Sequence, residues 1–232
     1  MNKKIIGFLL VSILLFACSV KALQIVKLDE SSGFSVETIF IEETTTNVYI
    51  LSNAKKECIL IDPAISTKQI AKTLTNNNYK PKAIFLTHNH WDHSTGIIEL
   101  SKILKIPVIT NNHQIEMGKS PLGKPLTGRN LIEVSNRQII KYADMDINII
   151  FTAGHSTGSM CFYHEASDFL FSGDTLFKES IGRTDFPGSE KEKIIPSVMT
   201  VLNTVKEDTN IYPGHGGKTT KKHELMYNPF LM

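Results

Sequence analysis

The feature that most constrains this chain is a cluster of ionisable side chains directly after a short apolar run. Residues 83–86 have the composition of a buried strand, and the next seven are Thr87-His88-Asn89-His90-Trp91-Asp92-His93. Open α/β folds place their functional sites at the carboxyl ends of such strands. Imidazole and carboxylate groups together suit zinc, iron or manganese, and the lack of cysteine is unlike a closed structural zinc site. The segment therefore predicts a metal site.

Three later ionisable residues share one setting, because each follows a short apolar run and adjoins a glycine. They are His155, Asp174 and His215. A neighbouring glycine lets the backbone approach another segment closely. Since the arrangement occurs three times, we expect these side chains to join the cluster at 88–93 in one site. The remaining histidines of the body lack this context and are expected to be ordinary surface or helix residues: His113, His164 and His223.

The spacing of apolar residues predicts strands alternating with helices. The expected strands are 25–27, 35–41, 47–51, 58–61, 83–86, 106–110, 147–151, 159–163, 169–172 and 210–212, and the expected helices are 67–74, 97–104 and 194–205. Asp62 and Pro63 are expected to end one strand as a turn. Cys58 and Cys161 lie in apolar runs and are expected to be buried and free. No repeat or linker divides residues 23–232, so we expect one α/β domain.

The order of these ionisable residues resembles that of the metallo-β-lactamase superfamily. His88-x-His90-x-Asp92-His93 is followed by His155, Asp174 and His215, and the resemblance runs from about Gly33 to the C-terminus. It implies an αββα sandwich, in which two mixed β-sheets are flanked by helices. It also implies two divalent metal ions, with zinc expected first and iron or manganese as alternatives. By position, His88, His90 and His155 would bind the first ion, Asp92, His93 and His215 the second, and Asp174 would bridge them.

Two further segments are similar to the glyoxalase II-like thioester hydrolases of that superfamily. They are residues 173–177, Gly-Asp-Thr-Leu-Phe, and 182–188, Gly-Arg-Thr-Asp-Phe-Pro-Gly. Hydroxyacylglutathione hydrolases carry a C-terminal helical extension, which we expect to be absent because 17 residues follow His215. Those enzymes place a glutathione-contacting lysine where this chain has Arg183. An arginine can hold a substrate carboxylate through two hydrogen bonds, or it can pair with Asp185, and the sequence leaves both open.

The resemblance implies hydrolysis of a small-molecule thioester, with a glutathione thioester as one candidate. A hydroxide shared by two ions about 3.5–4 Å apart would attack the carbonyl carbon, and Asp92 and Asp174 would orient it and carry its proton. A thiolate leaves with little help from an acid. Trp91 is expected to pack beneath the site.

Several other functions share parts of this pattern. A persulfide dioxygenase would use one iron, but the complete second ligand set argues against it. An exported β-lactamase is disfavoured because the resemblance associates a carboxylate at the position of Asp174 with the hydrolase branch. A lactonase or phosphoester hydrolase could use the same site, and the sequence does not separate these from a thioesterase. A non-catalytic binding module would have no use for a complete ligand set.

The N-terminus has the parts of a secretory signal peptide. Two lysines precede an apolar run at residues 5–17. These 13 residues fall short of the roughly 20 that a membrane-spanning helix needs, which disfavours an uncleaved anchor. We expect cleavage after Ala22 and a periplasmic or secreted protein without a stable membrane span. The alternative is a lipobox that would lipidate Cys18 and tether the protein.

The overall charge carries no sign of a nucleic-acid partner. The formal net charge of the whole chain is +2. Residues 1–22 contain three lysines and no acidic residue, so the rest of the chain has 22 basic and 23 acidic side chains. We therefore expect a small-molecule substrate and no nucleic-acid partner.

Overall fold

The computed structural model describes residues 23–117, 126, 128 and 130–232. The predicted signal peptide at residues 1–22, with Cys18, lies outside the described residues. No helix in the described part of the chain is long and apolar enough to span a membrane.

The N-terminal half forms a mixed sheet whose strand order follows the sequence, β1 to β7. The first four strands pair antiparallel and the last four pair parallel. Their bounds are β1 Gln24–Ser31, β2 Phe34–Phe40, β3 Val48–Asn53, β4 Glu57–Ile61, β5 Lys80–Phe85, β6 Val108–Thr110 and β7 Leu131–Glu133. The parallel part therefore directs the ends of β4, β5 and β6 to one edge of the sheet.

The C-terminal half forms a second mixed sheet in the order β15-β14-β11-β10-β9-β8. β11 and β14 pair in parallel, and the other neighbours pair antiparallel. The bounds are β8 Ile139–Tyr142, β9 Met145–Phe151, β10 Met160–His164, β11 Phe169–Gly173, β14 Asn210–Pro213 and β15 Thr219–Thr220. A two-stranded hairpin, β12 Leu176–Phe177 with β13 Ser180–Ile181, follows β11.

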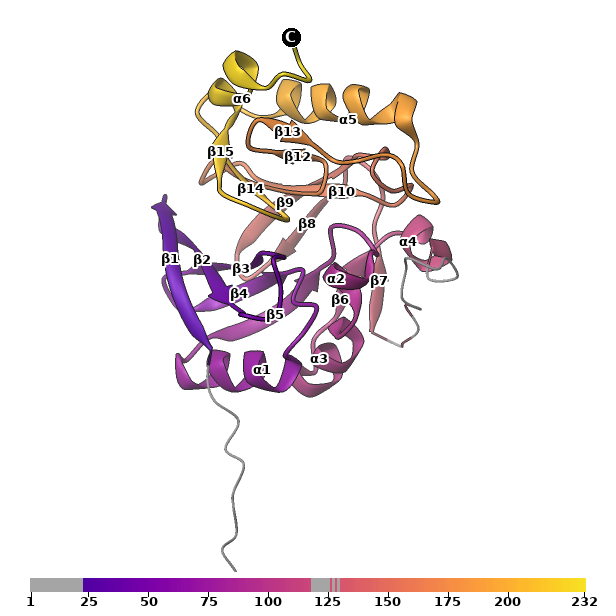
Figure 1. Cartoon of the computed structure of the whole chain (residues 1–232). Coiled ribbons are helices and arrows are strands. Elements are labelled where there is room, and N and C mark those ends of the chain that lie inside the picture. The colour runs from indigo at the N-terminus through magenta and orange to yellow at the C-terminus, as the bar shows by residue number, and fades with distance from the viewer. Residues whose placement is uncertain (1–22, 118–125, 127, 129) are drawn as a thin grey trace, which may run out of the picture.

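Helices cover the outer face of each sheet, so the layers are helix, sheet, sheet, helix (Figure 1). On the first sheet these are α1 Thr67–Asn76 and α3 Ile97–Leu104, and on the second α5 Lys191–Thr204 and α6 Lys221–Tyr227. Two short helices, α2 Trp91–Ser94 and α4 Asn112–Met117, follow β5 and β6. The expected αββα sandwich of two mixed sheets is confirmed.

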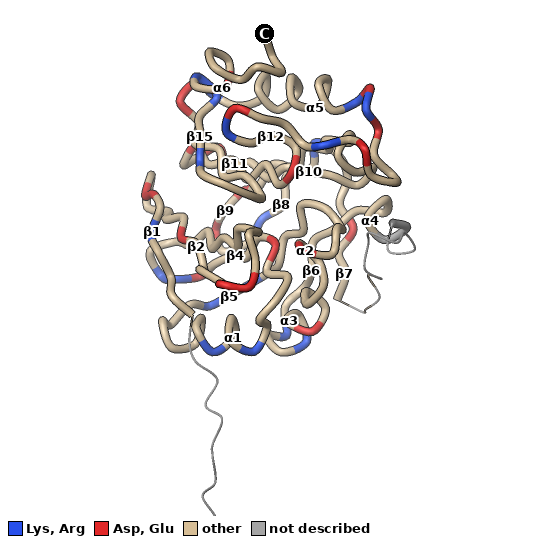
Figure 2. Tube along the Cα trace, viewed as in Figure 1, with Lys and Arg blue, Asp and Glu red and all other residues tan. Residues whose placement is uncertain are grey.

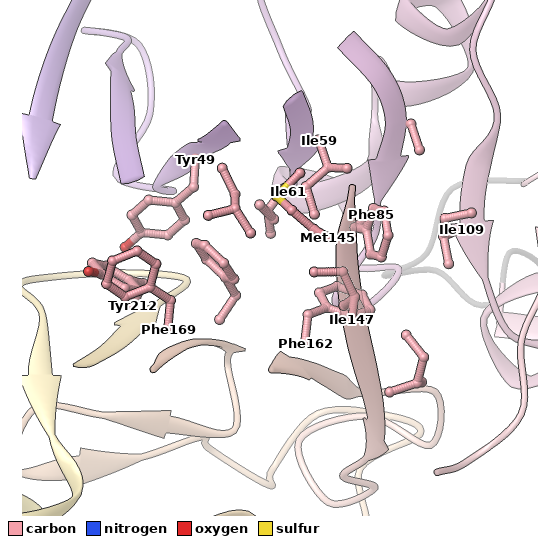
Figure 3. Close-up of a cluster of buried hydrophobic side chains, with 14 of the residues drawn as sticks. Tyr49, Ile59, Ile61, Phe85, Ile109, Met145, Ile147, Phe162, Phe169 and Tyr212 are labelled. Carbon is pink, nitrogen blue, oxygen red and sulfur yellow. The ribbon is translucent and has the colours of Figure 1, made fainter. Parts of the chain in front are cut away.

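The core follows from the alternation of side chains along the strands. In β4, Ile59 and Ile61 pack between the two sheets, whereas Cys58 and Leu60 face the helices of the first sheet. A strand points successive side chains to opposite faces, and a strand covered on both faces is therefore apolar throughout. Figure 3 shows aromatic rings and aliphatic chains from both sheets meeting in the layer between them.

The outer face of α1 is charged where its inner face is apolar. In α1, Ile70 and Leu74 are buried, whereas Lys68 lies on the exposed side. This division is the signature of a helix with one face on the core. Figure 2 shows basic and acidic residues mixed over both halves of the described chain.

Each predicted strand and helix has a counterpart in the structure, and Cys58 and Cys161 are buried and free as expected. One expectation about the histidines was wrong. His164 is 2% exposed at the end of β10, with Nδ1 2.6 Å from the hydroxyl of Ser167 and its ring edge-on to Phe34. It is a buried core residue, unlike His113 and His223, which lie in α4 and α6.

Candidate metal centre

The predicted ligand residues lie together at the edge where strands of both sheets end. The first sheet contributes His88 and His90 from the turn after β5, and Asp92 and His93 from α2. The second sheet contributes the side chains that follow β9, β11 and β14: His155, Asp174 and His215. Parallel pairing of β11 with β14 directs two of these turns to one place.

One group contains the three buried histidines His88, His90 and His155, whose candidate ligand atoms lie within 4.8 Å of one another. Nε2 of His155 is 2.9 Å from Nδ1 of His90. Nδ1 of His155 lies 2.8 Å from the carbonyl oxygen of Arg183. Because a carbonyl can only accept, Nδ1 carries the proton and the Nε2 lone pair faces the centre.

A second group contains Asp92, His93 and His215. Oδ2 of Asp92 lies 3.2 Å from Nε2 of His215 and 3.4 Å from Nε2 of His93. Nδ1 of His215 lies 3.1 Å from the carbonyl oxygen of Thr45, so its proton also points away from the centre. Both groups therefore draw side chains from each sheet; the first presents three imidazole nitrogens, and the second presents two nitrogens and a carboxylate.

Asp174 lies between the two groups. Its Oδ2 is 3.5 Å from Nε2 of His155 and 3.5 Å from Nε2 of His215, and its Oδ1 is 3.5 Å from Nε2 of His93. The glycine before His215 makes this approach possible, because a Cβ at Gly214 would lie 2.2 Å from Oδ1 of Asp174. No other residue fits there without movement.

The donor set fits two divalent ions. Nε2 of His88, Nε2 of His90 and Oδ1 of Asp174 are buried without a hydrogen-bond partner among the described residues. Buried polar atoms are normally paired, because leaving them unpaired is costly. Imidazole and carboxylate donors without thiolate suit zinc, iron or manganese. The two ligand groups, with Asp174 between them, therefore form His/Asp sites for a dinuclear metal centre.

The ionisation of the side chains in the centre follows from their burial and from the neighbouring carboxylates. Burial lowers the pKa of His90 to about 4, so its ring is neutral and can donate a lone pair. Burial alone would lower the pKa of His215, but hydrogen bonds with Asp174 and Asp92 raise it to about 10. In the metal-free protein a proton on His215 thus balances two carboxylates. Metal binding at these residues would release that proton.

Asp62 supports the centre from behind, although the sequence indicated only a turn at this position. Its carboxylate is 1% exposed, and Oδ1 accepts from the backbone N–H of Thr87 at 2.8 Å. Oδ2 accepts from the Thr87 hydroxyl at 2.5 Å and lies 2.8 Å from Nδ1 of His93. With both oxygens engaged, Asp62 orients His93 and directs its Nε2 inward. The sequence contained one indication of this role, because Asp62, like the ligand residues, directly follows an apolar strand.

A pocket opens beside the centre, lined partly by Trp91, Phe177, Arg183 and Phe186. The expectation that Trp91 packs beneath the site was wrong, because this side chain is 58% exposed. It lies on the outer side of α2 and forms part of the pocket wall. Nε and Nη2 of Arg183 each lie 2.6 Å from a carboxylate oxygen of Asp185, and the guanidinium covers the ring of Phe186. Of the two alternatives for Arg183, the structure contains the internal pair.

The chain is similar to several known proteins. A family model described as the metallo-β-lactamase superfamily matches residues 41–215. A probable metallo-hydrolase, YqgX of Bacillus subtilis, is 34% identical over 80% of this chain and 92% of its own. A hydroxyacylglutathione hydrolase, GloC of Haemophilus influenzae, is 26% identical over 85% of this chain and 98% of its own.

The fold comparison agrees with the sequence comparison. The crystal structure of the BLEG-1 B3 metallo-β-lactamase superposes with a TM-score of 0.77 at 28% identity, covering 85% of this chain and 99% of the other. The family match covers well over half of the chain, and both proposed ligand groups lie within it. The chain belongs to the metallo-β-lactamase superfamily.

Proposed function

We propose that this metallo-hydrolase is a dinuclear thioesterase, with hydroxyacylglutathione-type thioesters as its substrates. The observation that carries the dinuclear assignment is the position of Asp174 within 3.5 Å of histidines from both groups. His88, His90 and His155 would hold the first ion, and Asp92, His93 and His215 the second. The similarity to GloC supports the substrate class.

The chain's own residues would position the reactants. Two divalent ions held by these residues would lower the pKa of a water molecule and polarise a substrate carbonyl. Oδ2 of Asp92 accepts a hydrogen bond from the Thr46 hydroxyl at 3.0 Å, which fixes the carboxylate at the centre. The pKa of Asp92 stays below its usual range because His215 and His93 outweigh the effect of burial. Asp92 is therefore ionised, so it would bind the second ion and orient the attacking water by hydrogen bonding.

The pocket suits a substrate with an apolar acyl or thiol portion. Phe177, Ile181 and Phe186 line it together with exposed Trp91. Because Arg183 is paired with Asp185, a substrate carboxylate would have to displace Asp185 in order to bind there. A thiolate leaving group needs little protonation. This suits the pocket, because Arg183 and Asp185 are paired with each other and neither is free to act as a general acid.

The proposal is tested by metal analysis of the purified protein together with assays on thioesters, lactones and β-lactams. We expect two ions per chain and turnover of thioesters. His215→Ala should lose the second ion and keep the first. The control His223→Ala should keep both, because His223, on α6, pairs with Glu179 of the β12–β13 turn and not with the centre. One ion per chain in the active wild type would contradict the dinuclear assignment. Oxygen consumption with a persulfide substrate would then favour the iron dioxygenase.

β-Lactam hydrolysis is the second candidate function. The structural similarity to BLEG-1, described as a B3 metallo-β-lactamase, is the observation that favours it. The two candidates differ in the leaving group, which is a thiolate in one case and a ring amine that stays attached in the other. Faster turnover of β-lactams than of every thioester tested would reverse the order of the two proposals.

We also propose that the protein is exported. The support is the pattern of lysines and apolar residues at positions 1–22. Mass spectrometry of the mature N-terminus tests this proposal. A chain beginning at Leu23 supports secretion, a lipidated Cys18 supports tethering, and an intact Met1 contradicts both.

A further inference from the structure

Gln114 is a fully buried side chain that contacts the turns carrying His88 and His155 without being a candidate ligand. It lies in α4, directly after β6. Its Nε2 is within hydrogen-bond distance of three carbonyl oxygens, those of Leu86 at 3.1 Å, Thr87 at 3.1 Å and Gly158 at 2.9 Å. Leu86 and Thr87 lead from β5 into His88, and Gly158 belongs to the turn after β9. One amide therefore joins a turn of the first sheet to a turn of the second.

Hydrogen bonds within the turn that contains His155 hold Gly158 and His155 in a fixed relation. The backbone N–H of Thr152 donates to the carbonyl of Ser159 at 2.8 Å, and the hydroxyls of Ser156 and Ser159 are 2.9 Å apart. A displacement of Gly158 would therefore move His155 with it. On the other side, the backbone N–H of Met160 donates to the carbonyl of Thr87 at 2.9 Å.

Gln114 is itself fixed. Its Oε1 accepts from the Thr110 hydroxyl at 2.5 Å, and its backbone N–H donates to Oδ1 of Asn111 at 3.0 Å. Nδ2 of Asn111 in turn donates to the carbonyl of Gly158 at 3.0 Å. The fit is tight, because a Cβ at Gly158 would lie 2.7 Å from Cγ of Gln114. The amide and the glycine are therefore matched in shape as well as in hydrogen bonding.

We propose that Gln114 is a positioning residue for the first metal ion. By holding the carbonyls of Thr87 and Gly158 on one amide, it sets the separation of the His88 and His155 rings across the two sheets. This inference rests on the metal centre of the proposed function and is independent of which substrate the centre hydrolyses.

The test compares two variants of matched shape. Gln114→Met keeps the length of the side chain and removes the amide. The control is Asn53→Leu, since Nδ2 of Asn53 also bridges the two sheets by donating to the carbonyl of Ala143 at 3.1 Å. Asn53 ends β3 at the edge opposite the metal centre, so the control removes a similar link from the other end of the sandwich.

Three quantities are measured on each full-length protein: zinc affinity at each site by competition with a chelator, the visible spectrum of the cobalt-substituted protein, and stability of the metal-free protein in urea. Outer residues that orient metal ligands typically change affinity by about 10- to 100-fold. We expect Gln114→Met to weaken the first site by at least about tenfold and to change its cobalt spectrum, with a smaller effect on the second site. Asn53→Leu should lower stability and change neither affinity.

A loss of stability in Gln114→Met with unchanged first-site affinity and spectrum would overturn the proposal, because the amide would then be structural only. Equal weakening of both sites would overturn it as well. If Gln114→Met does not fold, Gly158→Ala takes its place, since its Cβ would displace Gln114 while leaving the amide present; unchanged first-site affinity there would count against the proposal. Failure of the unsubstituted protein to bind a first ion would instead contradict the proposed metal centre.

Discussion

Asp62→Asn changes one atom behind the metal centre and should reverse the tautomer of a ligand. In the structure, both Asp62 oxygens accept hydrogen bonds, and Oδ2 receives the proton on Nδ1 of His93. In the variant, the amide oxygen can keep the bond from the Thr87 N–H, but the NH₂ group then faces Nδ1 of His93. Two donors cannot pair, so the His93 proton moves to Nε2. Nε2 points at Asp92 and Asp174, where the second ion would bind.

The magnitude follows from the loss of that lone pair. Groups that fix the tautomer of a metal-bound histidine typically affect metal affinity by about 10- to 100-fold. This range corresponds to about 1.4–2.8 kcal/mol at the second site. The metal-free protein also loses a hydrogen bond to a buried charge, which contributes about 1.5–3 kcal/mol. We therefore expect a weaker second site and a less stable metal-free fold.

The assay is zinc titration of each site in competition with a chelator, with urea unfolding of the metal-free protein alongside. Asp29→Asn is the matched control, because Asp29 accepts from Tyr212 and Lys218 away from the centre. It should leave both zinc affinities unchanged. A second-site affinity in Asp62→Asn within about twofold of the wild type would refute the tautomer argument, whatever happens to stability.

Four further predictions concern single side chains. Asp174→Ala should lower turnover by at least about a hundredfold and Asp174→Asn nearly as much, and undiminished turnover would contradict the bridging role. Arg183→Ala should leave KM nearly unchanged because Arg183 pairs with Asp185; a large rise in KM would instead indicate substrate binding. Phe162→Ala, in the layer between the sheets, should cost about 3–5 kcal/mol in urea unfolding, and a cost below 1 kcal/mol would contradict its packing. Burial lowers the pKa of His164 to about 4, so the unfolded state binds more protons below pH 6.5 and stability should fall by up to about 3 kcal/mol as the pH drops from 6.5 to 4. His164→Gln should lack this component, and an identical pH profile would contradict the assignment.

Local sequence pattern was enough to predict most of the strands and the three longest helices, α1, α3 and α5. β4 and β11 are apolar throughout because both of their faces are covered, so they stand out from the sequence. β7 and β8 were not predicted, because they are three and four residues long and partly exposed. Their pairing depends on neighbouring strands rather than on their own composition.

The ligand residues could be singled out because each lies directly after an apolar strand. Gln114 could not be found in this way, since its role depends on carbonyl oxygens of Leu86 and Gly158, which are 28 and 44 residues distant in sequence. His164 was misjudged because its neighbours in sequence, Glu165 and Ala166, suggest a surface turn. Its burial comes from Phe34, which belongs to the other sheet. Contacts between residues of the two sheets cannot be predicted from the pattern of neighbouring residues in the sequence.

The His88-His90-His155 group and the Asp92-His93-His215 group each take residues from both sheets, so neither of these two proposed sites is complete on one sheet. Separation of the sheets would therefore release the ions, and bound ions would resist that separation. By linkage, each tenfold rise in the free concentration of the bound metal ion above its dissociation constant would add about 1.4 kcal/mol of stability for each site. The resistance of the fold to opening between its two sheets would therefore depend on the metal concentration around it.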